Sequence, residues 1–341
     1  MDRTLPIGAI GLEYGERRLI SPVQPKQPVT QPCISIILPV YNAAPFVAQT
    51  LRHILAQSLS QWELIAVDDG STDQSWPILQ QLAQHDQRIR VIRQANQGVA
   101  AARNRAIALA QADLIAPIDA DDLWHPDFLA AHWHCHQRHP DIGVSYAWSL
   151  DIDPADAVLG GFQAATVRCW VADTLRCHNF LGNGSCTVMR RSLLRTIGGY
   201  RPQFGAKANP VMGTAICEDW DLYLRLAALA PFYPVRQFLV GYRKQPDSAS
   251  TQRDRMAYWY GELQAAHPCP HLRPWVTQLS QWSFQRYLQR QSPPPLSATA
   301  PFPTPPPRHL VLIHLQLTRI LHWSIGHFGH RTRVPAPTSL V

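Results

Sequence analysis

A short apolar run that ends in three carboxylates is the segment of this sequence best suited to chemistry. Leu114 to Ile118 is apolar, and Asp119, Asp121 and Asp122 follow within four residues. An apolar run of this length predicts a buried strand. Carboxylates crowded at a strand end repel one another, and a divalent cation with oxygen ligands relieves that repulsion. The alternative for the same residues is a solvated acidic turn that caps the next helix.

Two further acidic pairs lie at the ends of predicted elements. Asp68 and Asp69 directly follow an apolar run, and Glu218 and Asp219 open a helical stretch. A carboxylate in such a place can accept a hydrogen bond from a nucleobase or take a proton from an attacking hydroxyl. Each pair also has an ordinary explanation, because Asp is common in turns before Gly and at helix N-termini.

Strand and helix patterns alternate between Cys33 and Ser149. Alternation of this kind favours an α/β fold with a parallel sheet and helices on both faces. Ligands of such sheets bind at the carboxyl ends of the strands, where the acidic pairs lie. The expected strands are 34–38, 64–67, 89–92 and 114–118, and the expected helices are 46–57, 78–83 and 99–110.

The remainder of the chain is less regular and is divided by composition. We expect a helix over 220–230 and a short strand that ends at Tyr242, and residues 252–290 have a helical, aromatic-rich pattern. A Pro-rich stretch after Ser292 predicts a stiff linker. The predicted division is a disordered lead-in (1–32), one domain in two halves (33–149 and 150–250), a helical extension (251–291), a linker (292–308) and a basic amphipathic tail (309–341).

Charge and cysteine content limit the partners. The formal net charge is +7, and all of the excess lies after Glu262, where seven Arg occur without an acidic residue. The tail lacks Lys and a regular basic–aromatic alternation, so nucleic acid is not expected as a partner. An apolar stripe over 309–328 predicts peripheral membrane contact through 309–333, and a packing helix or frayed tail is the alternative. Seven Cys without a CxxC pair indicate a reducing, cytoplasmic location.

Five polar motifs follow one another at predicted strand ends and helix starts. In this order they resemble the motifs of family-2 inverting glycosyltransferases of the GT-A fold, over residues 33–250. The motifs are Pro39-Val40-Tyr41-Asn42, Asp68-Asp69-Gly70-Ser71-Thr72-Asp73, Gln97 to Asn104, Asp119-Ala120-Asp121-Asp122 and Glu218-Asp219-Trp220-Asp221.

The resemblance implies a reaction and a set of partners. A sugar would pass from a nucleotide-sugar donor, with a UDP-sugar favoured, to an acceptor hydroxyl, with inversion and with Mn²⁺ or Mg²⁺ as cofactor. A glycan or lipid-linked acceptor in polysaccharide or cell-envelope glycan synthesis is the expected partner. The chain would act in the cytoplasm, with possible placement at the inner face of the plasma membrane.

The resemblance also implies a nucleotide-binding half (33–149), an acceptor half (150–250) and donor-side roles. Pro39, Tyr41 and Asn42 would contact the nucleotide, and Tyr41 offers a flat face to the base. Asp69 would accept a hydrogen bond from the base. Arg103 lies near a helix start and suits a phosphate or a base carbonyl; an ordinary surface Arg is its alternative.

The catalytic and metal-binding roles fall on the later acidic motifs. Asp119 and Asp121 match the family's D-x-D, with Asp121 on the metal and Asp119 on the ribose or the metal. Asp219 matches the catalytic base, and its place at a helix N-terminus is expected to keep it ionised. Glu218 and Asp221 are the alternative bases, and the competing explanation is that Glu218 or Asp219 is only a helix N-cap.

Weaker expectations concern Asp68, Asp122 and the segment after Tyr242. Asp68 fits a turn, and Asp122 fits support or capping of the next helix. Relatives often have His where Gln245 stands. Because Gln carries no positive charge, any part in stabilising phosphate would fall to Arg243 or the next residue, Lys244.

Other functions agree less well with the sequence. An aspartyl phosphatase would have its D-x-D at the first strand, which here ends in Pro39 to Asn42. A catalytically inactive nucleotide-sugar-binding or scaffold protein is the main alternative, although all the expected acidic positions are present. His132 and His136 have the i, i+4 spacing of a zinc clip but no evident third ligand, so a solvated or packed helix face is favoured.

Overall fold

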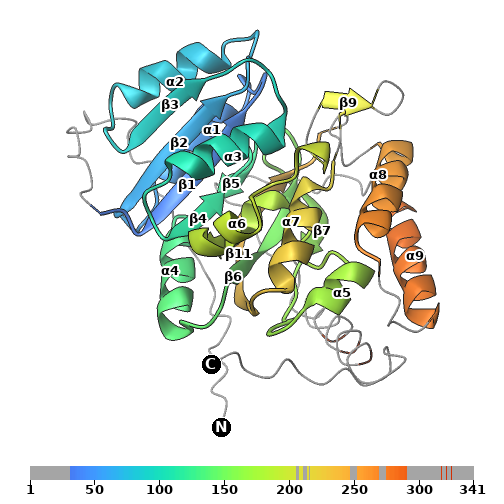
Figure 1. Cartoon of the computed structure of the whole chain (residues 1–341). Helices are drawn as coiled ribbons and strands as arrows, with labels where there is room; N and C mark the ends of the chain where they lie inside the picture. The colour runs from blue at the N-terminus through green and yellow to red at the C-terminus, as the bar shows by residue number, and fades with distance from the viewer. Residues whose placement is uncertain are drawn as a thin grey trace.

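The computed structural model describes residues 31–204, 207–209, 213–214, 216–245, 252–268 and 274–289, with the single positions 316, 320 and 324. Its central feature is a nine-stranded sheet with the order β3-β2-β1-β4-β8-β6-β11-β5, to which β7 adds beside β6 (Figure 1). Its strands are β1 Ile34–Val40, β2 Trp62–Asp68, β3 Ile89–Arg93, β4 Leu114–Pro117, β5 Leu123–Trp124, β6 Val144–Ile152, β7 Val158–Gln163, β8 Thr187–Arg190 and β11 Phe232–Arg243. A separate pair joins β9 Lys207–Asn209 to β10 Gly213–Thr214.

Helices surround this sheet. They are α1 Val47–Leu55, α2 Ser75–Ala83, α3 Val99–Leu109, α4 Phe128–Arg138, α5 Ala172–Cys177, α6 Arg191–Thr196, α7 Glu218–Ala227, α8 Arg253–Ala266 and α9 Pro274–Gln289. Every residue of β1 and of β2 is buried, so both faces of the sheet are covered there. Continuous apolar strands of this kind are typical of parallel sheets between helix layers.

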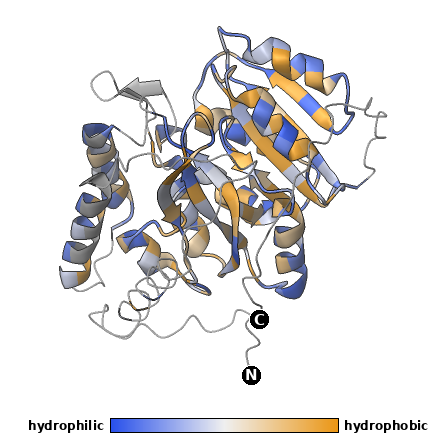
Figure 2. Cartoon of the chain, turned by 180° about the vertical axis from the view of Figure 1, so that it is seen from behind, coloured by the Kyte–Doolittle hydropathy of each residue, from blue (hydrophilic) through white to orange (hydrophobic). Residues whose placement is uncertain are grey.

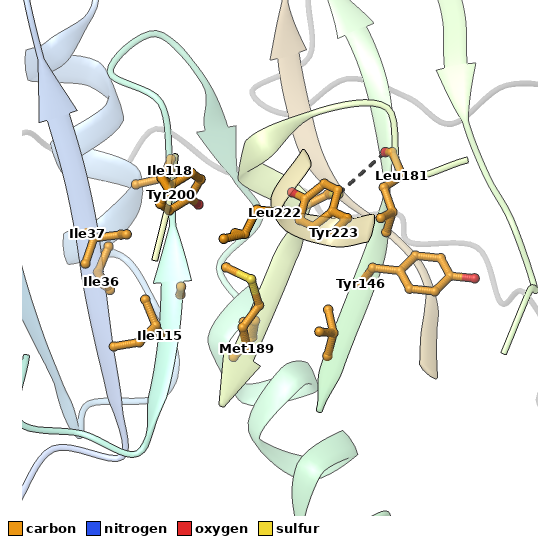
Figure 3. Packing of buried hydrophobic residues seen from close by; sticks show 14 of the residues in the cluster. Ile36, Ile37, Ile115, Ile118, Tyr146, Leu181, Met189, Tyr200, Leu222 and Tyr223 are labelled. Atoms are coloured by element: carbon orange, nitrogen blue, oxygen red, sulfur yellow. Dashed lines mark hydrogen bonds between the residues drawn. The ribbon is translucent and has the colours of Figure 1, made fainter. Parts of the chain in front are cut away.

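The core joins the two halves of the domain. Figure 3 shows Ile36 and Ile37 of β1 beside Ile115 of β4, with Met189 of β8 and Leu222 of α7 packed further along. In Figure 2 the central strands are mostly hydrophobic, whereas the helices alternate hydrophobic and hydrophilic residues. Burial of each large aliphatic side chain contributes roughly 1.5–3 kcal/mol.

Strand direction brings distant motifs to one edge. β1 is parallel to β2 and β4, and β6 is parallel to β11. Because β8 is antiparallel to both β4 and β6, these two groups of strands run the same way. The carboxyl ends of β1, β2, β4 and β11 therefore lie along the same edge of the sheet.

The elements expected from the sequence are present, but several of them begin or end at other residues. The helix predicted over 46–57 is α1, Val47–Leu55, and the one predicted over 220–230 begins earlier, at Glu218. The short strand expected before Tyr242 was wrong, because β11 extends over 12 residues. Exposed Arg236 and Gln237 lie at a register shift within it and interrupt its apolar pattern.

Several expectations fall on parts of the chain that are not described. The predicted lead-in lies almost wholly outside the described residues, as do the linker (292–308), residues 246–250 and nearly all of the basic tail. The helical extension predicted over 251–291 corresponds to α8 and α9. Among the helices that are described, none has both the length and the apolar character needed to cross a membrane.

Candidate active site

A cavity of about 210 Å³ lies at the carboxyl ends of β1 and β2. Tyr41 at its rim is 49% exposed, so one face of its ring is open to a flat ligand. Three donor-side residues predicted from the sequence, Pro39, Tyr41 and Asp69, therefore line one cavity. The other lining residues are Val40 of the first motif, Gly98, Val99 and Ala102 of the motif that opens α3, and Asn96, which lies outside the motifs singled out in the sequence.

Asp69 is fixed in this cavity by the start of α3. Its Oδ2 accepts from the Gly98 backbone N–H at 2.7 Å, and its Oδ1 accepts from the Gln97 N–H at 3.0 Å and the Gln94 amide at 2.7 Å. Gly98 has φ of 91°, a conformation that favours Gly. The turn before α3 thus holds Asp69 rigidly.

Asn42 and Asp68 organise the loops beneath the cavity. The Asn42 side chain accepts from the Thr72 backbone N–H at 2.8 Å, and Asp68 is fully buried and pairs with Arg93 at 3.1 Å. Both residues connect the ends of neighbouring strands. Their contacts favour structural support of the site over contact with the nucleotide.

The three carboxylates after β4 differ in environment. The Asp119 side chain is 31% exposed, whereas Asp122 is fully buried. Asp122 accepts from the Ser185 hydroxyl at 2.5 Å and from the Arg243 backbone N–H at 2.9 Å. Burial, followed by the carboxylates of Asp121 and Asp119, raises the pKa of Asp122 well above its ordinary value. These contacts agree with the structural support expected of Asp122, whereas capping of a helix was wrong, because β5 follows it.

Gln245 contacts the predicted metal ligand. Its amide donates to Asp121 Oδ2 at 2.6 Å. Burial, followed by Asp119, raises the pKa of Asp121 to about 6, and the Gln245 hydrogen bond opposes that rise. Arg243, expected to face phosphate, is instead fully buried: it pairs with Asp156 at 2.7 Å and donates to the Asp121 carbonyl at 2.7 Å. These contacts favour a structural role for Arg243.

Arg103 joins the donor side of the site to the acceptor side. Its guanidinium pairs with Asp119 at 2.5 Å and with Glu218 at 2.6 Å, and its carbon lies 5.1 Å from the centre of the Tyr200 ring. The side chain is only 2% exposed. The expectation of a guanidinium directed at phosphate or base therefore needs correction: two carboxylates occupy both of its terminal nitrogens.

Glu218 and Asp219 form the first turn of α7. Asp219 Oδ1 accepts from the Trp220 backbone N–H at 2.7 Å. Burial, followed by the negative charge of Glu218, raises the pKa of Asp219 to about 7. The expectation that the helix N-terminus keeps Asp219 firmly ionised was therefore wrong, because desolvation outweighs the helix end. A carboxylate with a pKa near 7 suits a general base.

Asp221, one of the two alternative bases, is fully buried in a cluster of basic groups. It pairs with Arg225 at 2.8 Å, with Arg201 at 3.3 Å and with His267 at 2.8 Å. These partners surround its oxygens, so an acceptor hydroxyl has no access to it in this arrangement.

Asp119 and Asp121 suit a divalent cation. They are hard oxygen ligands, and their repulsion is visible in the raised pKa of Asp121. Mg²⁺ and Mn²⁺ sites commonly combine one or two carboxylates with substrate phosphates, so two residues suffice. Among the described residues, no group of three or more His, Cys, Asp or Glu side chains converges on one point.

The histidines of α4 belong to the core. His132 lies 2.7 Å from the Ser145 hydroxyl, and His136 lies 3.3 Å from the Val188 carbonyl. Burial lowers the pKa of both below the ordinary value. This is the packed helix face that the sequence favoured over a zinc clip.

Comparison with known proteins agrees with this geometry. The model of the family described as glycosyl transferase family 2 matches residues 35–198. The chain belongs to glycosyl transferase family 2. The matched region contains the motifs that line the cavity at the ends of β1 and β2 and the Asp119–Asp122 segment, whereas α7 lies beyond it.

Curated relatives of this family 2 member match parts of it. A putative teichuronic acid biosynthesis glycosyltransferase of Bacillus subtilis, TuaG, is 44% identical over 100 residues, which are 29% of this chain and 40% of TuaG. Chondroitin synthase of Escherichia coli is 26% identical over 203 residues, 59% of this chain and 27% of that protein. The chain thus spans well under two thirds of the length of these relatives.

Solved structures show that this family 2 member has the GT-A fold. S. aureus TarS residues 1–349 in complex with UDP align with a TM-score of 0.53 and 16% identity, over 76% of this chain and 72% of that one. The mannosyltransferase PcManGT of Pyrobaculum calidifontis, in complex with GDP-Man and Mn²⁺, aligns with a TM-score of 0.52 and 20% identity, over 79% and 76%.

Proposed function

We propose that this chain transfers a sugar from a nucleotide-sugar donor to an acceptor hydroxyl, with inversion and with a divalent metal. A UDP-sugar is the favoured donor. The acceptor is a glycan or a lipid-linked sugar in polysaccharide or cell-envelope glycan synthesis. The named relatives in teichuronic acid and chondroitin synthesis support this class of acceptor.

One observation carries the proposal. The buried Arg103 pairs with Asp119 beside the donor cavity and with Glu218 beside Asp219. It therefore fixes the spacing between the proposed metal ligands and the proposed base. Inverting transfer needs this arrangement, because the acceptor must attack the anomeric carbon on the face opposite the leaving diphosphate.

The donor side binds the nucleotide. Tyr41 presents its exposed ring face to the base, and Asp69, held by the start of α3, accepts a hydrogen bond from the base. Asp119 and Asp121 would hold Mn²⁺ or Mg²⁺, and the ion would neutralise charge on the leaving diphosphate. The complexes of TarS with UDP and of PcManGT with GDP-Man and Mn²⁺ support a diphosphate-nucleotide ligand and a metal.

The acceptor side removes a proton. Asp219, with a pKa of about 7, accepts the proton of the acceptor hydroxyl while the oxygen of that hydroxyl bonds to the anomeric carbon. Glu218 keeps the pKa of Asp219 raised and is itself fixed by Arg103. Asp219 is thus the proposed catalytic residue, and Arg103 and Glu218 position it.

A thermal-shift screen tests the proposal. UDP, GDP and their sugars are added with Mn²⁺ or with chelator to the wild type and to Asp121→Ala. We expect a UDP-sugar with Mn²⁺ to raise the melting temperature most, since a ligand at 100 times its Kd adds about 2.7 kcal/mol. In Asp121→Ala the part of the melting-temperature shift that depends on Mn²⁺ should be lost. Equal melting-temperature shifts with Mn²⁺ and with chelator would contradict the metal dependence of donor binding. The configuration of the product, read from the NMR signal of its anomeric proton, tests inversion.

A peripheral membrane location is the remaining part of the proposal. Residues 309–333 contain Arg but no acidic residue, and a basic amphipathic segment binds anionic lipid. Deletion of residues 292–341 should therefore release the protein from anionic liposomes in a flotation assay. Equal flotation of the full and shortened chains would contradict membrane contact through this segment and leave the glycosyltransferase proposal intact.

A further inference from the structure

Helices α8 and α9, together called the hairpin below, contact α7, the helix that carries Asp219, through the side chains of Tyr260 and His267. α8 buries Met256, Trp259, Tyr260 and Leu263, the spacing of one helix face, and α9 packs against α5 (Figure 1). This hairpin lies beyond the residues matched by the family model.

Two contacts of the hairpin fall on the residues that follow Asp219. The Trp220 ring lies 5.5 Å from that of Tyr260, which stacks on Phe284 of α9 at 3.8 Å. His267, which follows α8, contacts the fully buried Asp221 at 2.8 Å through its Nε2. Because the Asp221 carboxylate accepts, the His267 Nε2 donates in this bond.

The backbone that leads into α7 needs such support. Cys217 has φ of 74°, a left-handed backbone conformation that residues other than Gly and Asn rarely adopt. A strained residue persists only where surrounding contacts determine it. The first turn of α7, with Glu218 and Asp219, follows directly.

We propose that the α8–α9 hairpin positions Asp219 for proton removal, through the hydrogen bond from His267 to Asp221. His267 is a positioning residue and touches neither donor nor acceptor. The Asp221 carboxylate pairs with His267 after α8, with Arg225 of α7 and with Arg201. The hairpin thereby sets the angle at which the first turn of α7 meets the donor side. The inference rests on the proposed function, since it assigns the hairpin a part in the same site.

Three variants test the inference in the full chain. His267→Leu removes the donor of the hydrogen bond, and His267→Gln keeps an N–H that can reach Asp221. Gln264→Leu is the matched control, because Gln264 donates from the same helix to the Arg176 carbonyl of α5 at 3.3 Å and leaves α7 untouched.

Kinetics give the first measurement. UDP release from UDP-glucose and UDP-N-acetylglucosamine is followed with Mn²⁺, and UDP affinity is measured by calorimetry. We expect His267→Leu to lower kcat by about tenfold or more with the Kd of UDP unchanged, since small misplacements of reacting groups cost up to about 100-fold. His267→Gln should recover most of kcat, and Gln264→Leu should match the wild type. Wild-type kcat in His267→Leu, or equal losses in all three variants, would overturn the inference.

Hydrogen exchange gives a second measurement that needs no substrate. In His267→Leu the backbone amides of residues 218–222 should exchange faster than in the wild type, whereas Gln264→Leu should leave them unchanged. Unchanged exchange at these amides in His267→Leu would refute the positioning role. If the wild type released no UDP while this exchange difference held, the proposed function would fail and the coupling of the hairpin to α7 would stand.

Discussion

The two halves of the domain hold their acidic residues in different ways. In the donor half, Asp69 accepts from backbone and side-chain N–H groups of the turn that immediately follows β3. In the acceptor half, Glu218 depends on Arg103, which lies 115 positions away, and α7 depends on His267 of the C-terminal hairpin. The contacts of Asp69 thus join positions 25 to 29 apart, whereas those of Glu218 and Asp221 join positions 115 and 46 apart.

This difference matches the tasks that we propose for the two halves. Recognition of a nucleotide needs fixed acceptors and an open aromatic face, which strand ends and a helix start provide. Proton removal needs a carboxylate whose pKa is raised toward 7, which burial next to a second carboxylate provides for Asp219. We therefore expect the proposed base to be more sensitive to distant substitutions than the residues that line the cavity.

The largest expected effect concerns the acceptor half. Asp219→Asn removes the proposed base, whose contribution to kcat is about 10²–10⁴-fold. UDP affinity measured by calorimetry should remain close to that of the wild type. Asp113→Asn, at a side chain that is 94% exposed, is the control and should keep full turnover. Wild-type turnover in Asp219→Asn would exclude it as the base.

Arg103→Met tests the connection between the halves. It leaves Asp119 and Glu218 without their partner, and removal of one member of a buried pair costs about 3–5 kcal/mol. We expect the lower part of that range, because Asp119 is 31% exposed. Urea unfolding measures the loss. A stability equal to that of the wild type would show that the two carboxylates do not rely on Arg103.

A smaller effect is expected on the donor side. Tyr41→Ala removes the exposed ring at the cavity, and stacking of a base on an aromatic ring contributes about 1–3 kcal/mol. UDP affinity should fall by roughly tenfold, whereas Tyr41→Phe should bind UDP as the wild type does. If both variants bound UDP equally well, the base would not stack on this ring.

The smallest expected effect concerns Gln245. Its hydrogen bond opposes the raised pKa of Asp121, so Gln245→Leu should raise that pKa above about 6. Near pH 6 more of the Asp121 carboxyl is then protonated, and Mn²⁺ affinity in the presence of UDP should fall by a few-fold. Near pH 8 the variant and the wild type should bind Mn²⁺ alike. A difference that is the same at both pH values would contradict this explanation.

Much of the donor half could be predicted from the sequence, because its information is local. Strand and helix patterns placed Pro39, Tyr41 and Asp69 at neighbouring strand ends, and the structure brings them to one cavity. The contact of Gln245 with Asp121 joins positions 124 apart, and that of Arg103 with Glu218 joins positions 115 apart. Periodicity contains no information about such pairs.

The electrostatic state of Asp219 could not be predicted for a related reason. A position at a helix N-terminus favours the ionised carboxylate by at most about 1 kcal/mol at an exposed site. The opposing contribution is burial against Glu218, which depends on packing by the whole acceptor half. The local signal thus predicted the place of the residue and gave the wrong direction for its pKa.

The pH dependence of kcat/KM tests the central claim most directly. Asp219 must be deprotonated to accept a proton, and its pKa is raised to about 7 by burial and then by Glu218. UDP release by the wild type should therefore rise with pH through a midpoint near 7. Glu218→Gln removes the second of these causes and should move that midpoint to lower pH. A profile that is flat between about pH 5 and 8.5, or a midpoint that Glu218→Gln leaves in place, would contradict the assignment of Asp219 as the base.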